Sequence, residues 1–567
     1  MDAMIPVLAE AEKNSSIVVE DKQIFYFLKI KCRYMKKLLL PFLLISMIIV
    51  SCDQSASEKS RKEKFKGFMI DAARDVEKMN YYYRLLDFFS EKGFNVIIFR
   101  LTDDEGCAMK FSSHPELITH QGAYSAEEIK KFIAYASTKH IEIIPEIESF
   151  GHTKYITRTQ RYSYLRDYPD ETYWMNAICP LHDTTLKIMK DLYTEVASIF
   201  PCRYIHIGCD EVDFGASAWS QEMLKTKSKS EIYALYINTL NRYVKEQGKK
   251  TIIWGDMIIH RNDPQILDML DKDIVMMDWN YWDIDDKKID SIAREVIARG
   301  FELIGAPAAN WFAWGPRIGL YQLENLLCFS RVYHHLDDPK NLGLIVTHWA
   351  PKRYIQNCQW DTYALIADIL NHPGSFDFNQ SISGFCQQHY GLPADDETVV
   401  FFREIYQQTP SHSLLNPTQV PLVFQGKPML RLFPWNSMDY VRKHIATRDS
   451  LLPNPFRSLA EKAHSLEPSV VRNKTDFSEF VITLEFIAHL IDRDNMMWKL
   501  CHTNPSMHEM KKMLAIQAEA DSTWVHRLDS LWQTGRTGPI DSGHLWEFPR
   551  AARFTAQLAV HPGMIKK

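Results

Sequence analysis

The sequence has no cysteine pattern of the kind that marks a metal site or a disulfide framework. Its ten cysteines include no Cys-x-x-Cys pair and no Cys/His cluster with zinc-finger spacing. They are scattered along the chain, and scattered cysteines mostly behave as small buried hydrophobic residues. The sequence therefore implies no metal site, and it does not predict a fold held by disulfides.

An excess of positive charge is also missing. The formal net charge is −5, which argues against a nucleic-acid-binding surface. No internal repeat and no low-complexity tract is visible, and a hydrophobic content of 46% with 24% charged residues is ordinary for a globular protein. Aromatic residues are plentiful, with 14 Trp and 25 Tyr. Some of them suit a sugar-binding cleft, and many will simply pack in the core.

The N-terminal region contains an export signal. Two lysines, Lys36 and Lys37, precede the apolar run 38–50, which ends at Ser51 and Cys52. A basic start, a short apolar core and a small residue before cysteine are typical of a secretory signal. The ending is similar to that of a bacterial lipoprotein signal, with Cys52 as the lipidated residue. The alternative is a plain signal anchor, although the run is short for a full membrane span.

This pattern predicts an exported protein, held at the periplasmic side or at the cell surface by its lipid anchor only. We expect Met35 to be the true start, which makes 1–34 a non-native upstream extension and 35–52 the signal peptide. Residues 53–65 are mostly polar and charged, and they are typical of a flexible tether.

Eight strand-like runs alternate with helical patterns in residues 66–375. The expected strands are 67–71, 94–99, 141–145, 203–212, 251–256, 274–279, 301–306 and 343–349. Such alternation predicts a parallel α/β architecture, a (β/α)8 TIM barrel. Polar and aromatic residues gather where these strands end, and in such barrels that end carries the active site.

The pattern changes after residue 375. Helical stretches follow without a further strand series, at 395–407, 456–465, 475–493 and 507–533. We therefore expect residues 376–567 to form a C-terminal α-helical region beside the barrel.

The fourth expected strand ends in two adjacent carboxylates, Asp210 and Glu211. Side chains alternate along a strand, so Glu211 would face away from Asp210 unless the strand ends or bulges there. Two neighbouring acids in a partly dry site repel, and one can stay ionised while the other keeps a proton. A glycosidase needs such a pair. The alternative is an ordinary solvated loop start.

The residues around this pair carry a resemblance. The segment His206-Ile207-Gly208-Cys209-Asp210-Glu211 resembles the H-x-G-[GC]-D-E signature of glycoside hydrolase family 20, the β-N-acetylhexosaminidases. The cysteine variant is similar to the hexosaminidase D-like branch of that family. The resemblance covers roughly residues 66–365, and its motifs occur in the family's order.

The other motifs lie at the ends of expected strands. Residues 66–74 are similar to R-G-x-x-L-D-x-x-R, 101–106 to L-T-D-D-Q-G and 145–152 to P-E-I-D-x-P-G-H, and Trp254-x-Asp256 also fits. Two positions depart from the family pattern. Lys66 stands where the family has arginine, and Pro351 stands where a glutamate is usual.

The resemblance implies substrate-assisted, retaining, exo-acting hydrolysis of terminal β-linked GlcNAc or GalNAc, without a cofactor. In this family the 2-acetamido oxygen of the substrate attacks C1 and forms an oxazolinium ion. Glu211 is then the general acid and base, and Asp210 orients the acetamido group. The implied substrate-binding residues are Lys66, Arg74, His152, His206, Trp254, Asp256, Trp279, Tyr281, Trp311 and Trp349.

The expected partner is a glycan or amino-sugar oligosaccharide. The departures at Lys66 and Pro351 leave one alternative open, a catalytically weak or inactive sugar-binding barrel. A family 18 chitinase type would require a D-x-x-D-x-D-x-E strand, which the sequence lacks.

Overall fold

The computed structural model describes residues 63–173, 175–259, 265–310, 320–393, 395–409, 434–537, 540 and 545–565. The expected signal peptide, the expected lipidation site Cys52 and the expected substrate-binding residue Trp311 lie outside these residues. No helix in the described ranges is long and apolar enough to cross a membrane.

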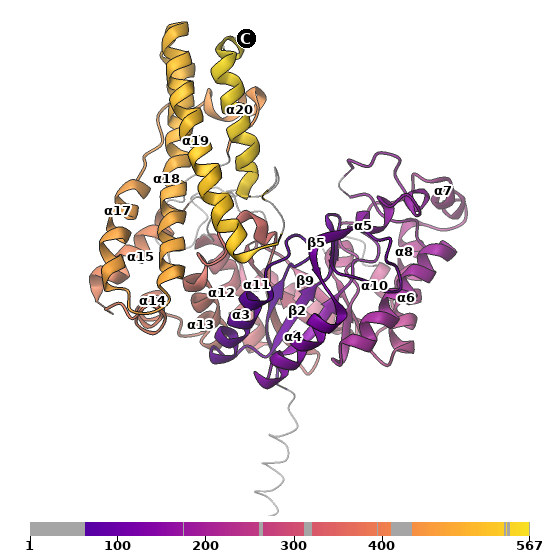
Figure 1. Cartoon of the computed structure of the whole chain (residues 1–567). Helices are drawn as coiled ribbons and strands as arrows, with labels where there is room; N and C mark the ends of the chain where they lie inside the picture. Colours follow the sequence, from indigo (N-terminus) through magenta and orange to yellow (C-terminus); the bar gives the residue numbers. More distant parts are fainter. Residues whose placement is uncertain are drawn as a thin grey trace, which may run out of the picture. The chain divides into compact units, whose positions relative to one another are not determined.

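Eight parallel strands form a closed barrel within the described residues (Figure 1). They are β1 (Phe65–Ile70), β2 (Val96–Arg100), β6 (Glu142–Glu146), β7 (Tyr204–His206), β8 (Lys250–Trp254), β9 (Val275–Trp279), β10 (Glu302–Ala306) and β12 (Asn341–His348). The barrel closes because β1 pairs in parallel with both β2 and β12. The predicted (β/α)8 fold is therefore confirmed, with each strand close to its expected position.

Helices connect successive strands around the barrel. The longer ones are α3 (Met79–Glu91), α4 (Ala126–Thr138), α6 (Asp183–Ile199), α8 (Lys229–Glu246), α11 (Asp286–Ala298), α12 (Leu320–His335) and α13 (Trp360–Asn371). The shorter ones are α5 (Lys154–Thr157), α7 (Ala218–Leu224), α9 (Asp256–Ile259) and α10 (Gln265–Met269). Ser125 begins α4 with a capping box to Glu128, as its sequence context predicts.

Additional short strands lie in two of the connections. A small sheet follows β2 and contains β3 (Thr102–Asp103), β4 (Gly106–Met109) and β5 (Thr119–Tyr124). A further strand, β11 (Ala308–Asn310), pairs with β12. None of these strands was expected. Three of them have only two to four residues, too short to show a strand period, and β5, with six residues, is mostly polar and exposed at its start. The β3–β4 hairpin places Asp103 and Asp104 beside the barrel mouth.

The C-terminal region is helical, as predicted, and belongs with the barrel to one compact unit, Lys64–Lys567. Its helices are α14 (Phe378–Phe385), α15 (Asp396–Gln408), α16 (Met438–Tyr440), α17 (Phe456–Leu466), α18 (Lys474–His502), α19 (Met507–Gly535) and α20 (Phe548–Val560). Helix α18 extends beyond the expected 475–493 because Met497 and Leu500 continue its buried face.

A buried arginine links the last three of these helices. Arg493 of α18 forms an ion pair with Asp521 of α19, with an Nε–Oδ2 distance of 2.9 Å. Its Nη2 also donates to the Ala551 carbonyl and to the Thr555 hydroxyl of α20, at 2.9 Å each. A buried cation is tolerated only when it is paired and hydrogen-bonded. All of these partners lie within the helical region itself.

Candidate active site

A cavity of about 680 Å³ opens at the carboxyl ends of the barrel strands. Its lining residues are Arg74, Asp103, Asp104, Glu105, His152, Asp210, Glu211, Trp279, Tyr281, Trp282, Trp349, Ala350, Lys352 and Arg353. They follow β1, β2, β6, β7, β9 and β12, so the cavity occupies the usual active-site position of this fold. Its volume is in the range of small-molecule sites.

The backbone after β7 is irregular, and this irregularity aims two acids at the cavity. The strand ends at His206, and Gly208, Cys209 and Glu211 all have positive φ angles, of 65°, 75° and 50°. A Cβ at Gly208 would collide with the Glu148 carboxylate. The prediction that the strand ends here and lets both acids face one cleft is confirmed.

Hydrogen bonds hold this strained segment. A non-glycine residue in the left-handed region costs roughly 1–3 kcal/mol, so Cys209 and Glu211 need support from their surroundings. The Cys209 N–H donates to Glu148 Oε2 at 3.2 Å, and the Glu211 N–H donates to Asp256 Oδ2 at 3.0 Å. Asp256 is absent from the cavity lining among the described residues. Contact of Asp256 with substrate stays a prediction; in the structure its carboxylate holds the Glu211 backbone.

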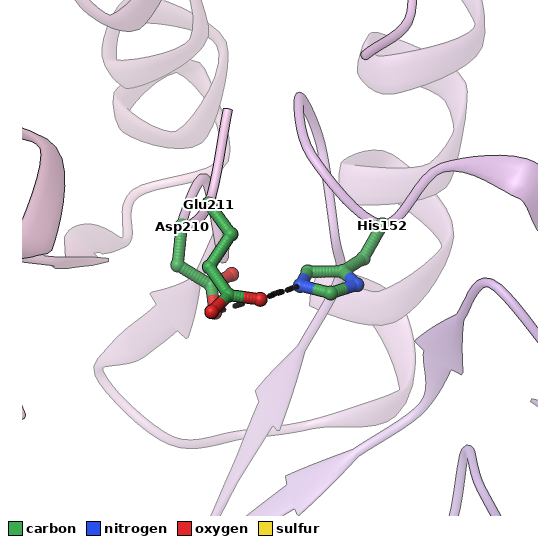
Figure 2. Close-up of side chains that lie close together, drawn as sticks. All are labelled: His152, Asp210 and Glu211. Carbon is green, nitrogen blue, oxygen red and sulfur yellow. Dashed lines mark hydrogen bonds and ion pairs between the residues drawn. The ribbon is translucent and has the colours of Figure 1, made fainter. Parts of the chain in front are cut away.

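His152 faces both acids across the cavity floor (Figure 2). Its Nε2 lies 3.1 Å from Glu211 Oε2 and 3.8 Å from Asp210 Oδ2. On the other side of the ring, Nδ1 lies 3.7 Å from Asp104 Oδ2 and 3.9 Å from Asp103 Oδ2. The imidazole is therefore surrounded by carboxylates.

This arrangement shifts the pKa values of the two partners. Burial alone would lower the pKa of His152, but the surrounding carboxylates, Asp210 foremost, raise it well above its usual value. Burial also raises the pKa of Asp210, and the nearby His152 cation counteracts part of that rise. The floor of the cavity thus holds an imidazolium between acids, which is an arrangement suited to proton transfer.

The same three side chains have the spacing of a metal site. The ligand atoms of His152, Asp210 and Glu211 lie within 4.8 Å of one another, close enough to surround one cation. A metal-binding imidazole must, however, be neutral at its ligating nitrogen. The surrounding carboxylates raise the pKa of His152, so a cation bound here would have to displace that proton. The spacing therefore suits both a hydrogen-bonded acid–base group and a cation site.

Arg74 lines the cavity after β1. Its Nη1 lies 3.1 Å from Asp71 Oδ2 and its Nη2 lies 3.1 Å from Asp103 Oδ2. The guanidinium carbon also lies 5.1 Å from the centre of the Trp349 ring. Two carboxylates and an aromatic face therefore fix this cation at the cavity wall.

Lys66 lies elsewhere, which corrects the expectation that it contacts substrate. It is near the amino end of β1, whereas the cavity lies at the carboxyl ends of the strands. Its Nζ donates to Asn371 Oδ1 at the end of α13, at 2.8 Å. Of the two cations expected from the first strand, Arg74 lines the cavity and Lys66 does not.

Three of the expected aromatic residues line the cavity. Trp279 stacks on Tyr281 with ring centres 5.0 Å apart, and the Trp349 Nε1 donates to the Tyr281 hydroxyl at 2.8 Å. They form a continuous wall with an apolar face, as a pyranose ring requires. Trp282 adds to this wall. It was not predicted, although it directly follows the Trp279-Asn280-Tyr281 segment.

Two other expected site residues lie beneath the cavity. Trp254 is fully buried, and its Nε1 donates to Glu146 Oε1 at 2.9 Å. The His206 ring packs 4.6 Å from the Trp254 ring, and its Nδ1 accepts the Gly208 N–H at 3.1 Å. Burial, together with Arg100, lowers the pKa of His206 well below its usual value, so the ring is neutral. Both residues support the floor and are not part of the cavity lining among the described residues.

Sequence reasoning missed Arg100, the last residue of β2. This fully buried cation lies 3.2 Å from Asp71 Oδ1 and 2.6 Å from Glu148 Oε1, and it also pairs with Asp103. Glu146 Oε1 lies 3.4 Å from its Nε. The available signal was a charged residue at the end of an otherwise apolar strand.

The cavity rim also carries cations that were not predicted. Lys352 and Arg353 follow the departure at Pro351, and the Lys352 Nζ lies 2.6 Å from Glu105 Oε1. The position where the family usually has an acid is thus followed by two basic side chains.

Residues 64–315 match the family model described as "Glycosyl hydrolase family 20, catalytic domain". A beta-hexosaminidase of Vibrio furnissii is 28% identical over 250 residues, covering 38% of this chain and 40% of that protein. A beta-hexosaminidase of Porphyromonas gingivalis is 24% identical over 217 residues, covering 34% of this chain and 28% of that protein. The chain thus spans well under half the length of these curated relatives.

Solved structures that match this chain include a beta-N-acetylhexosaminidase from Bacteroides fragilis. It is 22% identical with a TM-score of 0.47, and the match covers 57% of this chain and 69% of that chain. The family match contains Arg74, His152, Asp210 and Glu211, whereas the rim residues after β12 lie beyond it. Residues 64–315, which contain all barrel strands except β12, are therefore similar to the catalytic domain of glycosyl hydrolase family 20.

Proposed function

We propose that this chain is an exo-acting β-N-acetylhexosaminidase of the hexosaminidase D-like type, which releases terminal β-linked GlcNAc or GalNAc from glycans. The observation that carries the proposal is the group of Asp210, Glu211 and His152 at the floor of an aromatic-walled cavity. The family match and the named relatives support a glycoside hydrolase.

The two acids differ in exposure, and this difference fits two roles. The side chain of Asp210 is 8% exposed and that of Glu211 is 30% exposed. The buried Asp210 carboxylate accepts the acetamido N–H, which strengthens the carbonyl oxygen as the nucleophile at C1. The more exposed Glu211 reaches the glycosidic oxygen and later a water molecule.

The reaction then takes two steps. The acetamido oxygen forms a bond to C1 while the C1–O bond to the leaving group breaks, and Glu211 gives its proton to the leaving oxygen. Glu211 next takes a proton from water as that water attacks C1 and opens the oxazolinium ring. Two displacements at C1 retain the configuration. The His152 cation beside both acids stabilises the negative charge that Glu211 acquires in the first step.

Replacing either acid should abolish most of the turnover. We expect Glu211→Gln and Asp210→Asn each to lower kcat on aryl β-GlcNAc and β-GalNAc glycosides by about 10²–10⁴-fold. For Glu211→Gln the loss should be smaller with a nitrophenyl leaving group than with an alkyl one, because nitrophenolate needs less protonation.

Asp213→Asn is the matched control for these variants. It removes a carboxylate from the same turn, but Asp213 accepts hydrogen bonds from Tyr168 and Tyr173 at 2.8 Å each and lies outside the cavity lining. Its activity should stay near that of the parent. A parent protein that is inert on both sugars, yet still binds GlcNAc in calorimetry, would instead favour the inactive sugar-binding barrel.

The acid limb of the pH profile should depend on His152. Because the His152 cation lowers the pKa of Asp210, removing it in His152→Gln should raise that pKa. Asp210 acts as a carboxylate, so the acid limb of kcat/KM should move to higher pH. His206→Gln removes a neutral ring and should leave the limb in place. If the parent, His152→Gln and His206→Gln all had the acid limb of kcat/KM at the same pH, the assignment of that limb to Asp210 would be contradicted.

Arg74 and Lys66 offer a direct test of which cation meets the sugar. Arg74→Met removes charge-assisted hydrogen bonds at the cavity wall, each of about 1.5–3 kcal/mol. We expect KM to rise at least tenfold in this variant. Lys66→Met removes a cation that bonds Asn371 instead, so its KM should match the parent. The reverse pattern in steady-state kinetics would restore the original assignment to Lys66.

We further propose that the protein is a lipoprotein anchored through Cys52, on the support of the basic, apolar and Ser-Cys sequence at 36–52. In a bacterial host, mass spectrometry of Cys52→Ser should show no lipid-modified N-terminal peptide. In a detergent phase-partition assay, the variant should move from the detergent phase to the aqueous phase. Cys32→Ser, which lies upstream of the expected start, should behave like the parent. Recovery of residues 1–34 on the mature chain would contradict this proposal.

A further inference from the structure

Arg536 lies where the C-terminal helical region meets the barrel. It directly follows Gly535, the last residue of α19, in an extended conformation, and only 4% of it is exposed. Its guanidinium carbon lies 4.1 Å from the centre of the Trp532 ring. The guanidinium therefore packs against the ring of Trp532, which belongs to α19.

The guanidinium binds the segment that follows β1. Its Nε lies 2.8 Å from Asp75 Oδ2 and 3.1 Å from Glu77 Oε2. The backbone continues the contact, because Glu77 and Arg536 form an antiparallel bridge and the Lys78 N–H donates to the Gly535 carbonyl at 2.7 Å. Asp75 is the neighbour of Arg74 in the chain, so this contact holds the segment that brings Arg74 to the cavity.

The same guanidinium binds the segment that follows β12. Its Nη1 donates to the Tyr354 carbonyl and its Nη2 to the Pro351 carbonyl, both at 2.8 Å. Between these two carbonyls lie Lys352 and Arg353 of the cavity rim, and Trp349 precedes them. One side chain thus joins the two segments that enter the cavity from the first and last strands of the barrel.

We propose that Arg536 is a positioning residue of the catalytic cavity, through which the C-terminal helical region fixes the segments 71–78 and 349–356. The guanidinium is suited to this task because it presents five donors in a rigid plane, whereas an ammonium is a point donor on a flexible stem. Both segments are connections rather than regular strands. The barrel region links them at one point, where the Ala350 N–H donates to Asp71 Oδ2 at 2.9 Å, and Arg536 holds both of them further along the chain. A displacement of about 1 Å in binding groups can cost roughly 10²-fold in rate.

The chain offers a matched control in Arg493. This arginine is also buried and paired, with Asp521, but its partners all lie within the helical region. A merely structural role for Arg536 would make the two arginines equivalent. A positioning role sets Arg536 apart, because only its loss should reach the cavity.

The test compares Arg536→Lys with Arg493→Lys in the full chain by amide hydrogen exchange. Lysine keeps the charge but cannot bind both carboxylates and both carbonyls at once. We expect segments 71–78 and 349–356 to exchange about tenfold faster in Arg536→Lys, the effect of losing one hydrogen bond to a charged group. In Arg493→Lys, segments 71–78 and 349–356 should exchange as in the parent, even if both variants lower the melting temperature by the same amount.

Kinetics provide the second readout, which rests on the proposed function. In Arg536→Lys, KM for the aryl glycoside should rise more than fivefold, while Arg493→Lys keeps the parent KM. A parent protein without activity would contradict the proposed function only, because the hydrogen-exchange comparison tests the positioning role without any activity. Unchanged exchange in both segments of Arg536→Lys would overturn the positioning role, whatever the kinetics.

Thr537→Val covers the case in which Arg536→Lys does not fold. The Thr537 hydroxyl contacts the carbonyls of Val76 and Gln121 at 3.0 Å each, and the guanidinium stays intact. Here only segment 71–78 should exchange faster, by a smaller factor. No change in that segment would contradict the part of the proposal by which the C-terminal helical region fixes segment 71–78.

Discussion

The active site depends on one buried cation. Arg100 lies at the end of β2 without exposure to solvent and pairs with Asp71, Asp103 and Glu148. So many carboxylates beneath a cavity would repel one another and would take up protons if nothing compensated their charge. Removing one partner from such a buried network leaves uncompensated charge, which typically costs 3–5 kcal/mol. Burial raises the pKa of Glu148 well above its usual value and that of Glu146 to about 7, and the Arg100 cation counteracts part of both rises. Arg100 therefore compensates charge beneath the cavity and orients the carboxyl groups that pair with it.

This network also holds the backbone that carries the acid pair, Asp210 and Glu211. Glu148, held by Arg100, accepts the Cys209 N–H and so fixes the left-handed backbone that presents Asp210 and Glu211 to the cavity. Asp256 does the same for the Glu211 N–H. Glu148 thus takes part in both effects: it pairs with Arg100, and it stabilises the left-handed backbone at Cys209. Asp210 and Glu211 are thus presented to the cavity by Arg100, Glu148 and Asp256, which are absent from its lining among the described residues.

The sequence motifs were least precise about position. They name residues that belong near the site, but some of these lie at the other end of a strand or outside the cavity lining. Lys66 was assigned to substrate from a motif, yet four strand positions separate it from the end of β1. Trp254, His206 and Asp256 belong to the predicted site, and they are absent from the cavity lining among the described residues. A one-dimensional motif names the residues near a site, and it does not distinguish those that face the cavity from those that hold them.

The sequence by itself determined the barrel, the helical C-terminal region and the identity of the acid pair. Apolar runs of strand length alternating with amphipathic helices admit few other folds, and the Asp210-Glu211 signature is local. Only the tertiary structure decided the rest: the Arg100 network, the rim cations Lys352 and Arg353, and the contact of Arg536 with two distant segments. These arise between residues up to several hundred positions apart, where no local pattern records which side chains will meet.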